Sequence, residues 1–408
     1  MVRELAPQTR TGQYSRPAYS FGSRIGDPQF PPEAGRYHLY LGNACPWCHR
    51  VALAAVLRGM FRPVGWSEPE GLGVAEAEQQ QRQPPSEPSE PSGQWRAREL
   101  PLGPQTHTSA GRSGTARPRP IVGFTRLVDD PTRARRGGWV FGAEDPDPVF
   151  RAADLWQVYD TCQPGFRGRC TAPLLLDARG RAAVCNESAD IVRCLDAVHL
   201  PGCTDVTLRP QHLAAQIDGL NAKARAGPGA TQALGCLIYS AINNGVYRSG
   251  FATTQEAYDA VQAELWPALD EMEQRLRESR FLLGDRLTES DVWLFPTVIR
   301  LDAMYGPLFK CGRKRVFGSG PGGFGGDYPA LAGWARDIWQ LRVPGSLMQV
   351  RHTLNLDAAR SSYFSSLFPL NPSGIVPSGP TAADLGLEEP AGRGAGSSLH
   401  EVCFPRAG

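Results

Sequence analysis

The sequence predicts an α/β N-terminal unit followed by an all-helical C-terminal unit, with disordered insertions in both. A strand, a short loop and a cysteine at the start of a helix follow one another between residues 36 and 60. From about residue 210 the apolar residues recur at three- and four-residue steps, as on one face of a helix. This change of period separates a unit at 36–200 from a unit at 205–352.

The composition excludes several classes of function. The 408 residues are 41% apolar and 21% charged with a net charge of +2, which is typical of a soluble globular protein of two to three domains. No run of apolar residues is long enough to span a membrane, and the near-zero net charge gives no electrostatic footprint for nucleic acid. We therefore expect neither a membrane nor a nucleic-acid partner.

The cysteine content indicates a reducing compartment. Ten cysteines in 408 residues fall far short of a disulfide scaffold, and no secretion signal precedes the first strand. The first 14 residues are short for a transit peptide, so the sequence favours the cytoplasm and leaves plastid and mitochondrion open. We expect the cysteines to be free thiols.

The N-terminal unit is expected to begin after an extended segment at 1–35, where several prolines exclude regular structure. Alternating aromatic and aliphatic residues predict a strand at 36–41, and a helical run extends to Met60. Residues 67–120 contain too few aliphatic residues to offset the entropy of ordering, which predicts a disordered insertion. A hairpin around residues 178–180 and a helix from Glu187 complete this unit.

In the C-terminal unit, one apolar stripe predicts a long helix, and Thr288 to Asp291 form a capping box before a second one. Two insertions are expected, at 224–236 and 316–326, and an extended tail at 353–408. The residues of the long stripe are Tyr258, Val261, Leu265, Leu269, Met272 and Leu276.

The strongest chemical signal is the motif Cys45-Pro46-Trp47-Cys48, which follows the first strand and opens a helix. The unpaired N–H groups and the dipole at a helix N terminus stabilise a thiolate, which is the nucleophilic form of cysteine. Pro46 suits the first helical position, where an N–H group would have no partner. We interpret Cys45 as a nucleophile rather than as a small buried apolar residue.

Cys48 lies three residues after Cys45, within reach to donate a hydrogen bond to its thiolate or to form a disulfide with it. A metal site built on Cys45, Cys48 and His49 would need a second ligand pair at suitable spacing, and the sequence does not supply one. We therefore expect no metal.

Two further positions are candidates for ligand binding. Pro173, directly before an apolar strand, is either a cis proline that places a backbone edge beside the cysteine or an ordinary edge-strand proline. Glu187 and Ser188 offer a carboxylate, a hydroxyl and N–H groups to a small zwitterionic ligand, or else they cap a helix.

Together these features resemble a thioredoxin-fold glutathione transferase. The more specific motifs resemble the glutathionyl-hydroquinone reductases, the Xi class of the Omega-like glutathione transferases, over residues 14 to 380 outside the insertions. The motifs are Arg36-Tyr37-His38-Leu39-Tyr40 with Cys45-Pro46-Trp47, Gly168-Arg169-Cys170-Thr171-Ala172-Pro173, Asn186-Glu187-Ser188, Asn243-Asn244-Gly245-Val246-Tyr247, Gly250-Phe251-Ala252-Thr253-Thr254-Gln255, Phe309-Lys310-Cys311 and Asn371-Pro372-Ser373-Gly374-Ile375-Val376-Pro377.

The resemblance implies a glutathione-dependent reduction of glutathionyl-hydroquinones to hydroquinones. Cys45 would form a mixed disulfide with glutathione, which a second glutathione would resolve to oxidised glutathione. Tyr247 and Tyr305 are expected to protonate the hydroquinone ring. The family is usually dimeric, which implies a homodimer. Glutathione, the co-substrate, is expected to bind at Trp139, Ala172, Pro173, Glu187 and Ser188.

The chain departs from the family at three places. Many relatives have alanine at Cys48, and valine is usual at Ala172, although the backbone makes the contact there. The insertion at 224–236 interrupts a helix that should run into the Asn243 motif. Two alternatives therefore stay open: a glutaredoxin-like dithiol oxidoreductase that uses Cys45 and Cys48, and a non-enzymatic protein that binds glutathione conjugates.

Overall fold

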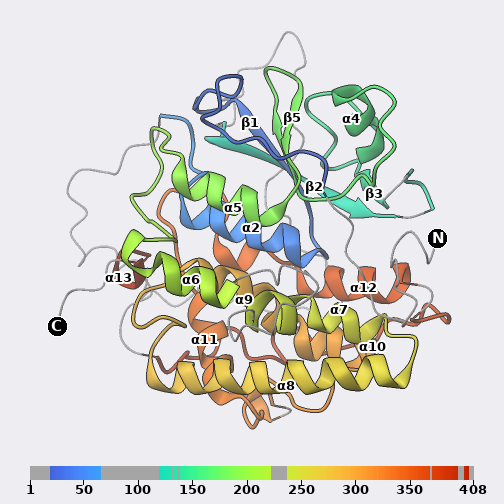
Figure 1. Cartoon of the computed structure of the whole chain (residues 1–408), viewed down its shortest axis with the longest axis vertical. Helices are drawn as coiled ribbons and strands as arrows, with labels where there is room; N and C mark the ends of the chain where they lie inside the picture. Colours follow the sequence, from blue (N-terminus) through green and yellow to red (C-terminus); the bar gives the residue numbers. More distant parts are fainter. Residues whose placement is uncertain are drawn as a thin grey trace, which may run out of the picture.

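A mixed sheet of five strands, in the order β3-β2-β1-β4-β5, organises the N-terminal half of the computed structural model (Figure 1). The central strand β1 runs parallel to β2 and antiparallel to β4, while β3 and β5 pair antiparallel with β2 and β4. The strands are β1 (Tyr37–Gly42), β2 (Val122–Asp129), β3 (Trp139–Phe141), β4 (Leu174–Asp177) and β5 (Ala182–Cys185).

The structure describes residues 19–65, 119–130, 132–135, 138–221, 237–318, 320–367, 370–393 and 399–403. The insertion expected at 224–236 and nearly all of that expected at 67–120 lie outside the described residues. Within the described ranges, the predicted first strand and the predicted hairpin are confirmed as β1 and the β4–β5 pair.

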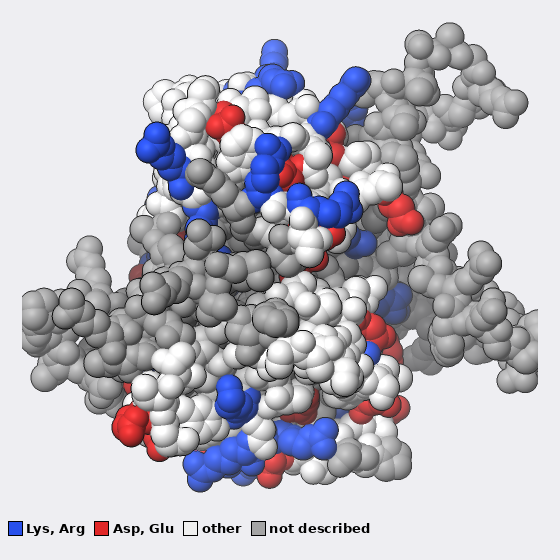
Figure 2. Space-filling view, turned by 90° about the vertical axis from the view of Figure 1, so that its right-hand side faces the viewer, with Lys and Arg blue, Asp and Glu red and all other residues white. Residues whose placement is uncertain are grey.

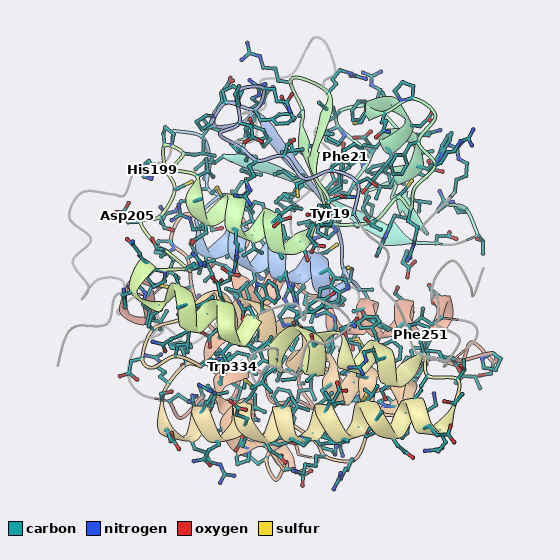
Figure 3. The ribbon with its side chains drawn as sticks, viewed as in Figure 1. Tyr19, Phe21, His199, Asp205, Phe251 and Trp334 are labelled. Carbon is teal, nitrogen blue, oxygen red and sulfur yellow. The ribbon has the colours of Figure 1, made fainter. Side chains whose placement is uncertain are left out.

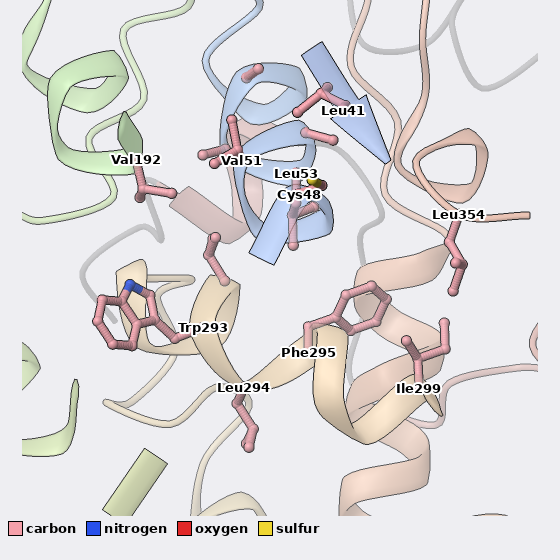
Figure 4. Close-up of a cluster of buried hydrophobic side chains, with 14 of the residues drawn as sticks. Leu41, Cys48, Val51, Leu53, Val192, Trp293, Leu294, Phe295, Ile299 and Leu354 are labelled. Atoms are coloured by element: carbon pink, nitrogen blue, oxygen red, sulfur yellow. The ribbon is translucent and has the colours of Figure 1, made fainter. Parts of the chain in front are cut away.

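Helices α2 (Pro46–Leu57) and α5 (Ser188–Ala197) lie side by side between the sheet and the helical half of the molecule, and α4 (Leu155–Cys162) lies away from that boundary (Figure 1). All residues of α2 except Trp47 are buried. The helix is apolar on nearly all sides because the sheet, α5 and the C-terminal half cover it together. Figure 4 shows Cys48 and Val51 of α2 between Val192 of α5 and Phe295 of the next domain.

The C-terminal half is helical, as the three- and four-residue spacing of its apolar residues predicted. The capping box is confirmed: Asp291 accepts a hydrogen bond from the backbone N–H of Thr288, at 2.9 Å, and Thr288 starts the buried helix α9. Two π-helical turns, Leu237–Asn243 and Leu301–Tyr305, precede α7 and α10. The helices are α6 (Ala214–Asn221), α7 (Gly245–Gly250), α8 (Gln255–Glu278), α9 (Glu289–Arg300), α10 (Gly306–Phe309), α11 (Pro329–Trp339), α12 (Leu356–Ser366) and α13 (Leu399–Cys403); short 3-10 turns lie at Gln211–Leu213, Pro321–Gly323 and Val350–His352.

The tail beyond residue 353 is not wholly extended, and that expectation is wrong for α12 and α13. The Asn355 side chain caps α12 by accepting a hydrogen bond from the N–H of Ala358, at 3.0 Å. The side chains of Tyr363 and Phe364 on this helix are buried. A local cap and two buried aromatic residues therefore stabilise a helix in a segment whose Ser-rich composition suggests an extended chain. None of the helices within the described ranges is long and apolar enough to cross a membrane.

Candidate active site

Cys45 occupies the N-cap position of α2, in the loop that follows the central strand β1. Its backbone is extended, with φ −73° and ψ 118°, and Pro46 begins the helix. The half-buried sulfur lies 3.7 Å from the carbonyl oxygen of Ala172. The peptide bond between Ala172 and Pro173 is cis, so the cis-proline interpretation of this position is confirmed. The structure therefore brings Cys45 and the Ala172–Pro173 loop together.

The electrostatic surroundings of Cys45 lower its pKa. Burial alone would raise it, but the Cys48 thiol and the backbone N–H groups of Cys48 and Trp47 donate hydrogen bonds to the sulfur. The positive charge of Arg300 lowers the pKa further. Three hydrogen bonds and the charge of Arg300 thus outweigh desolvation and favour the thiolate.

Cys48 shows the opposite behaviour. It is 1% exposed, and burial together with the adjacent Cys45 sulfur raises its pKa well above the ordinary value. Cys48 consequently keeps its proton and donates a hydrogen bond to the Cys45 thiolate. The pair therefore consists of one thiol whose pKa is lowered and one that stays protonated as a hydrogen-bond donor.

Tyr247 and Tyr305, the two tyrosines predicted as proton donors, lie in one cluster with Tyr363 beside this cysteine. The hydroxyl of Tyr363 lies 2.5 Å from that of Tyr247 and 3.1 Å from that of Tyr305. The Cys45 charge contributes to the raised pKa of both Tyr247 and Tyr305, although burial is the main cause. Burial also raises the pKa of Tyr363 well above its usual value. All three hydroxyls therefore stay protonated at neutral pH and serve as donors.

Aromatic rings pack around these tyrosines. The Trp47 ring stacks on that of Tyr247 with centroids 6.2 Å apart, which links the cysteine motif to α7. Phe309 contacts Tyr247 and Tyr305, each with centroids 5.2 Å apart, and also Tyr363. Figure 3 labels Phe251, which stacks on Tyr247. Such a cluster suits a flat aromatic substrate.

Sequence reasoning missed Tyr363, because α12 was expected to be an extended tail. The available signal was Asn355 with Asp357 two residues later, which is a helix-start pattern. It also missed Arg300, the last residue of α9, which is fully buried. A charged residue inside an apolar helical run was the signal there.

Trp139 lies in β3 with its ring directly over Gly42, the last residue of β1. A Cβ atom at position 42 would collide with that ring, so glycine lets the indole lie close to the strand where β1 leads into the Cys45 loop. The predicted glutathione contact at Trp139 is thus held against the strand that positions the cysteine.

Glu187 and Ser188 are buried at the N terminus of α5. The Glu187 carboxylate accepts a hydrogen bond from the N–H of Ala189, at 3.3 Å, so Glu187 does cap the helix. Tyr19 lies at the same helix end, where a hydrogen bond to Asp190 is among the causes of its raised pKa, after the charge of Asp190 and burial (Figure 3). The positive end of the helix dipole at this position is compatible with an anionic ligand.

His49 is not oriented to bind a metal. Its Nε2 lies 2.9 Å from Thr353 Oγ1, and its Nδ1 lies 2.8 Å from Arg300 Nη1. Because a guanidinium only donates, Nδ1 accepts and Nε2 carries the proton. Burial and then the Arg300 charge lower the His49 pKa well below its usual value, so the ring is neutral.

The surface beside β3 and α12 carries charges of both signs. Figure 2 shows Lys and Arg interspersed with Asp and Glu on this face, with an uncharged area over the helical half.

Comparisons with known proteins show the family of the chain. Residues 255–337 match the glutathione S-transferase C-terminal domain. The chain is 32% identical over 372 residues to the glutathionyl-hydroquinone reductase PcpF of Sphingobium chlorophenolicum, covering 88% of each chain. It is 30% identical to the glutathionyl-hydroquinone reductase YqjG of Escherichia coli, covering 94% of this chain and 92% of YqjG. The chain belongs to the glutathionyl-hydroquinone reductase family.

Solved structures place this family member in the Xi class of glutathione transferases. The Xi glutathione transferase of Phanerochaete chrysosporium matches with a TM-score of 0.65 at 29% identity, covering 91% of this chain and 94% of that one. The glutathione-bound structure of YqjG matches with a TM-score of 0.63 at 29% identity, covering 95% and 94%. The predicted transferase fold is confirmed, and the chain is an enzyme of the glutathione transferase family.

Proposed function

We propose that the protein reduces glutathionyl-hydroquinones to hydroquinones, with Cys45 as the nucleophile. The observation that carries the proposal is the position of one activated thiolate beside three protonated tyrosines. A thiolate and a set of acids are the two groups that cleavage of an aryl thioether requires. Relatives named for this reaction cover about nine-tenths of the chain, which supports the same substrate class here.

The first step needs acid catalysis, because an aryl carbanion is a poor leaving group. A tyrosine hydroxyl donates a proton to the ring carbon that bears sulfur, while a ring hydroxyl becomes a carbonyl and returns its proton to the hydrogen-bonded tyrosines, so that the donor is reprotonated. Tyr247 and Tyr305 are the proposed donors, with Tyr363 joined to both by hydrogen bonds.

Nucleophilic attack follows. The Cys45 thiolate attacks the glutathione sulfur, a disulfide bond forms, and the carbon–sulfur bond breaks. The released electron pair restores the aromatic ring, and the resulting oxyanion takes up a proton to give the hydroquinone. A second glutathione, as its thiolate, then attacks the mixed disulfide and leaves as oxidised glutathione. Glutathione is thus the reductant, and Cys45 returns to its starting state.

The tripeptide is proposed to lie across the end of the sheet at which β1 leads into the Cys45 loop. Trp139 and the backbone of Ala172 beside Pro173 would flank its cysteinyl part, and Glu187 with Ser188 would hold a charged end at the N terminus of α5. Cys48 would assist as a hydrogen-bond donor, because its raised pKa disfavours a role as a second nucleophile. A homodimer in the cytoplasm is the proposed working form.

Product analysis by mass spectrometry tests the proposal. The protein is mixed with glutathionyl-menadiol and excess glutathione, beside Cys45→Ser and Cys48→Ala variants. We expect menadiol and oxidised glutathione from the parent and from Cys48→Ala, and neither from Cys45→Ser. Turnover that survives in Cys45→Ser would refute the nucleophile, and tight conjugate binding without turnover in the parent would favour a binding function.

A further inference from the structure

We propose that Arg300 is a positioning residue for the nucleophile, which holds the loop before Cys45 from the other domain and thereby sets the sulfur between the cis-Pro173 loop and the tyrosines. The inference rests on the proposed role of Cys45. It adds a residue that touches neither the expected glutathione contacts nor the proposed proton donors.

The contacts of Arg300 converge on the catalytic loop. Its Nε donates to the carbonyl oxygen of Ala44 at 3.2 Å, and its Nη2 donates to that of Asn43 at 3.1 Å. The two carbonyls immediately precede the N-cap residue of α2, so they fix the direction in which Cys45 enters the helix. A planar guanidinium fork can bind both at once, whereas a single ammonium cannot.

Further hydrogen bonds hold the Arg300 side chain in place. Its Nη1 donates to the carbonyl oxygen of Pro296 at 2.9 Å and to His49 Nδ1 at 2.8 Å. The side chain is fully buried, and within the described part of the chain its hydrogen-bond partners are neutral groups. A buried cation with no carboxylate partner among the described residues is costly, and a nearby anion such as the Cys45 thiolate would offset that cost.

The charge of Arg300 acts on the nucleophile and on the tyrosine cluster. It lowers the pKa of Cys45, after the effects of burial and the neighbouring donors, and it opposes the burial-driven rise of the pKa of Tyr305 and Tyr363. A second tether supports the same loop, because Asn43 Nδ2 donates to the carbonyl of Asn355 at 2.9 Å and Asn43 Oδ1 accepts from the Asn355 N–H at 2.8 Å. Asn355 caps α12, which carries Tyr363. The same residue therefore links the loop before Cys45 to the helix of the third tyrosine.

The test measures the pH profile of Cys45 alkylation by iodoacetamide, read by mass spectrometry of the peptide that contains Cys45. This readout needs no hydroquinone substrate, so the inference can fail or stand independently of the proposed reaction. For Arg300→Met we expect the pKa of Cys45 to rise. Alkylation proceeds through the thiolate, so its rate follows the thiolate fraction wherever the thiol form predominates. If the raised pKa makes the thiolate about ten times scarcer, alkylation at pH 6.5 should slow about tenfold. Turnover of glutathionyl-menadiol should fall in kcat with the KM for glutathione unchanged.

Arg336→Met is the matched control, because Arg336 is 3% exposed and also donates to backbone carbonyls, those of Gly386, Gly322, Gly323 and Leu385. It should lose stability while the alkylation profile of Cys45 stays unchanged. If Arg300→Met does not fold, Arg300→Lys decides: it keeps the charge but loses the fork, and we expect kcat to fall at least about tenfold with a smaller displacement of the profile. A wild-type profile and a wild-type kcat in the folded variant would overturn the proposal.

Discussion

The hydroxyl oxygens of Tyr247 and Tyr363 lie 2.5 Å apart, although 116 residues separate them in the chain. Tyr363 also meets Tyr305, so three hydroxyls form a chain joined by two hydrogen bonds. With all three protonated, two protons serve those bonds and one remains to point outward. The cluster therefore offers a single directed proton rather than three independent ones.

Tyr363→Phe removes the middle of that chain. We expect kcat for glutathionyl-menadiol to fall about ten- to a hundredfold, since a positioned proton donor contributes at least that much. Steady-state kinetics in excess glutathione provides the measurement. Tyr328→Phe is the control, because Tyr328 is buried and donates to Asp270 in another part of the helical domain. Equal kcat values in Tyr363→Phe and the parent would exclude Tyr363 from the reaction.

Cys48→Ala removes the thiol that donates to Cys45. The pKa of Cys45 should rise, so alkylation and turnover should fall several-fold at pH 6.5 and recover at pH 9, where the thiolate forms without help. Cys48→Ser, which keeps a donor, should lie closer to the parent. A loss of turnover at every pH in both variants would instead support the dithiol route.

Much of the fold followed from the sequence because its local signals agree with the global structure. The strand before Cys45, the hairpin and the capping box at Thr288 each show a short-range pattern that tertiary contacts reinforce. The cis proline could not be decided from the sequence, because its only signal is a proline before an apolar strand. It took the contact between Cys45 and Ala172 to settle how the two segments meet.

The rest of the site depends on long-range packing that no local pattern encodes. Tyr305 ends a π-helical turn and Tyr247 lies in α7 just after another, and such turns alter which residues share a face. Tyr247 and Tyr305 were therefore found through the family resemblance rather than by periodicity. Local signals mark the start of α12 and the charged residue at the end of α9, but only the contacts show that Tyr363 and Arg300 belong to the site.

Gly42→Ala tests the contact that holds Trp139 over the catalytic strand. The added methyl group would displace the indole ring, so we expect the KM for glutathione to rise several-fold while kcat changes less. Titration of glutathione at saturating glutathionyl-menadiol measures it. Gly219→Ala is the control: it lies in α6 with nothing within 4 Å of the added atom, and it should be neutral or slightly stabilising. An unchanged KM in Gly42→Ala would argue against Trp139 as a glutathione contact.

Asp302 makes the stability of the helical domain depend on pH. Burial raises the pKa of its carboxyl from 3.8 to about 6, although the N–H groups of Phe317 and Val316 donate to it at 2.7 and 3.1 Å. The folded protein holds this proton more tightly than the unfolded chain. The contribution of Asp302 therefore stabilises the fold at low pH and is lost as the pH rises from about 4 to about 6.

Asp302→Asn cannot ionise, so its free energy of unfolding should lack this dependence. Relative to the variant, the parent should lose up to about 3 kcal/mol between pH 4 and pH 7, measured by urea denaturation at both pH values. Asp270→Asn is a control of opposite sign, because burial is outweighed there by Lys314 and Tyr328, which lower the pKa of Asp270. That variant should lose stability more at pH 7 than at pH 3. Parallel pH profiles for the parent and Asp302→Asn would show that the Asp302 carboxyl titrates alike in the folded and unfolded states.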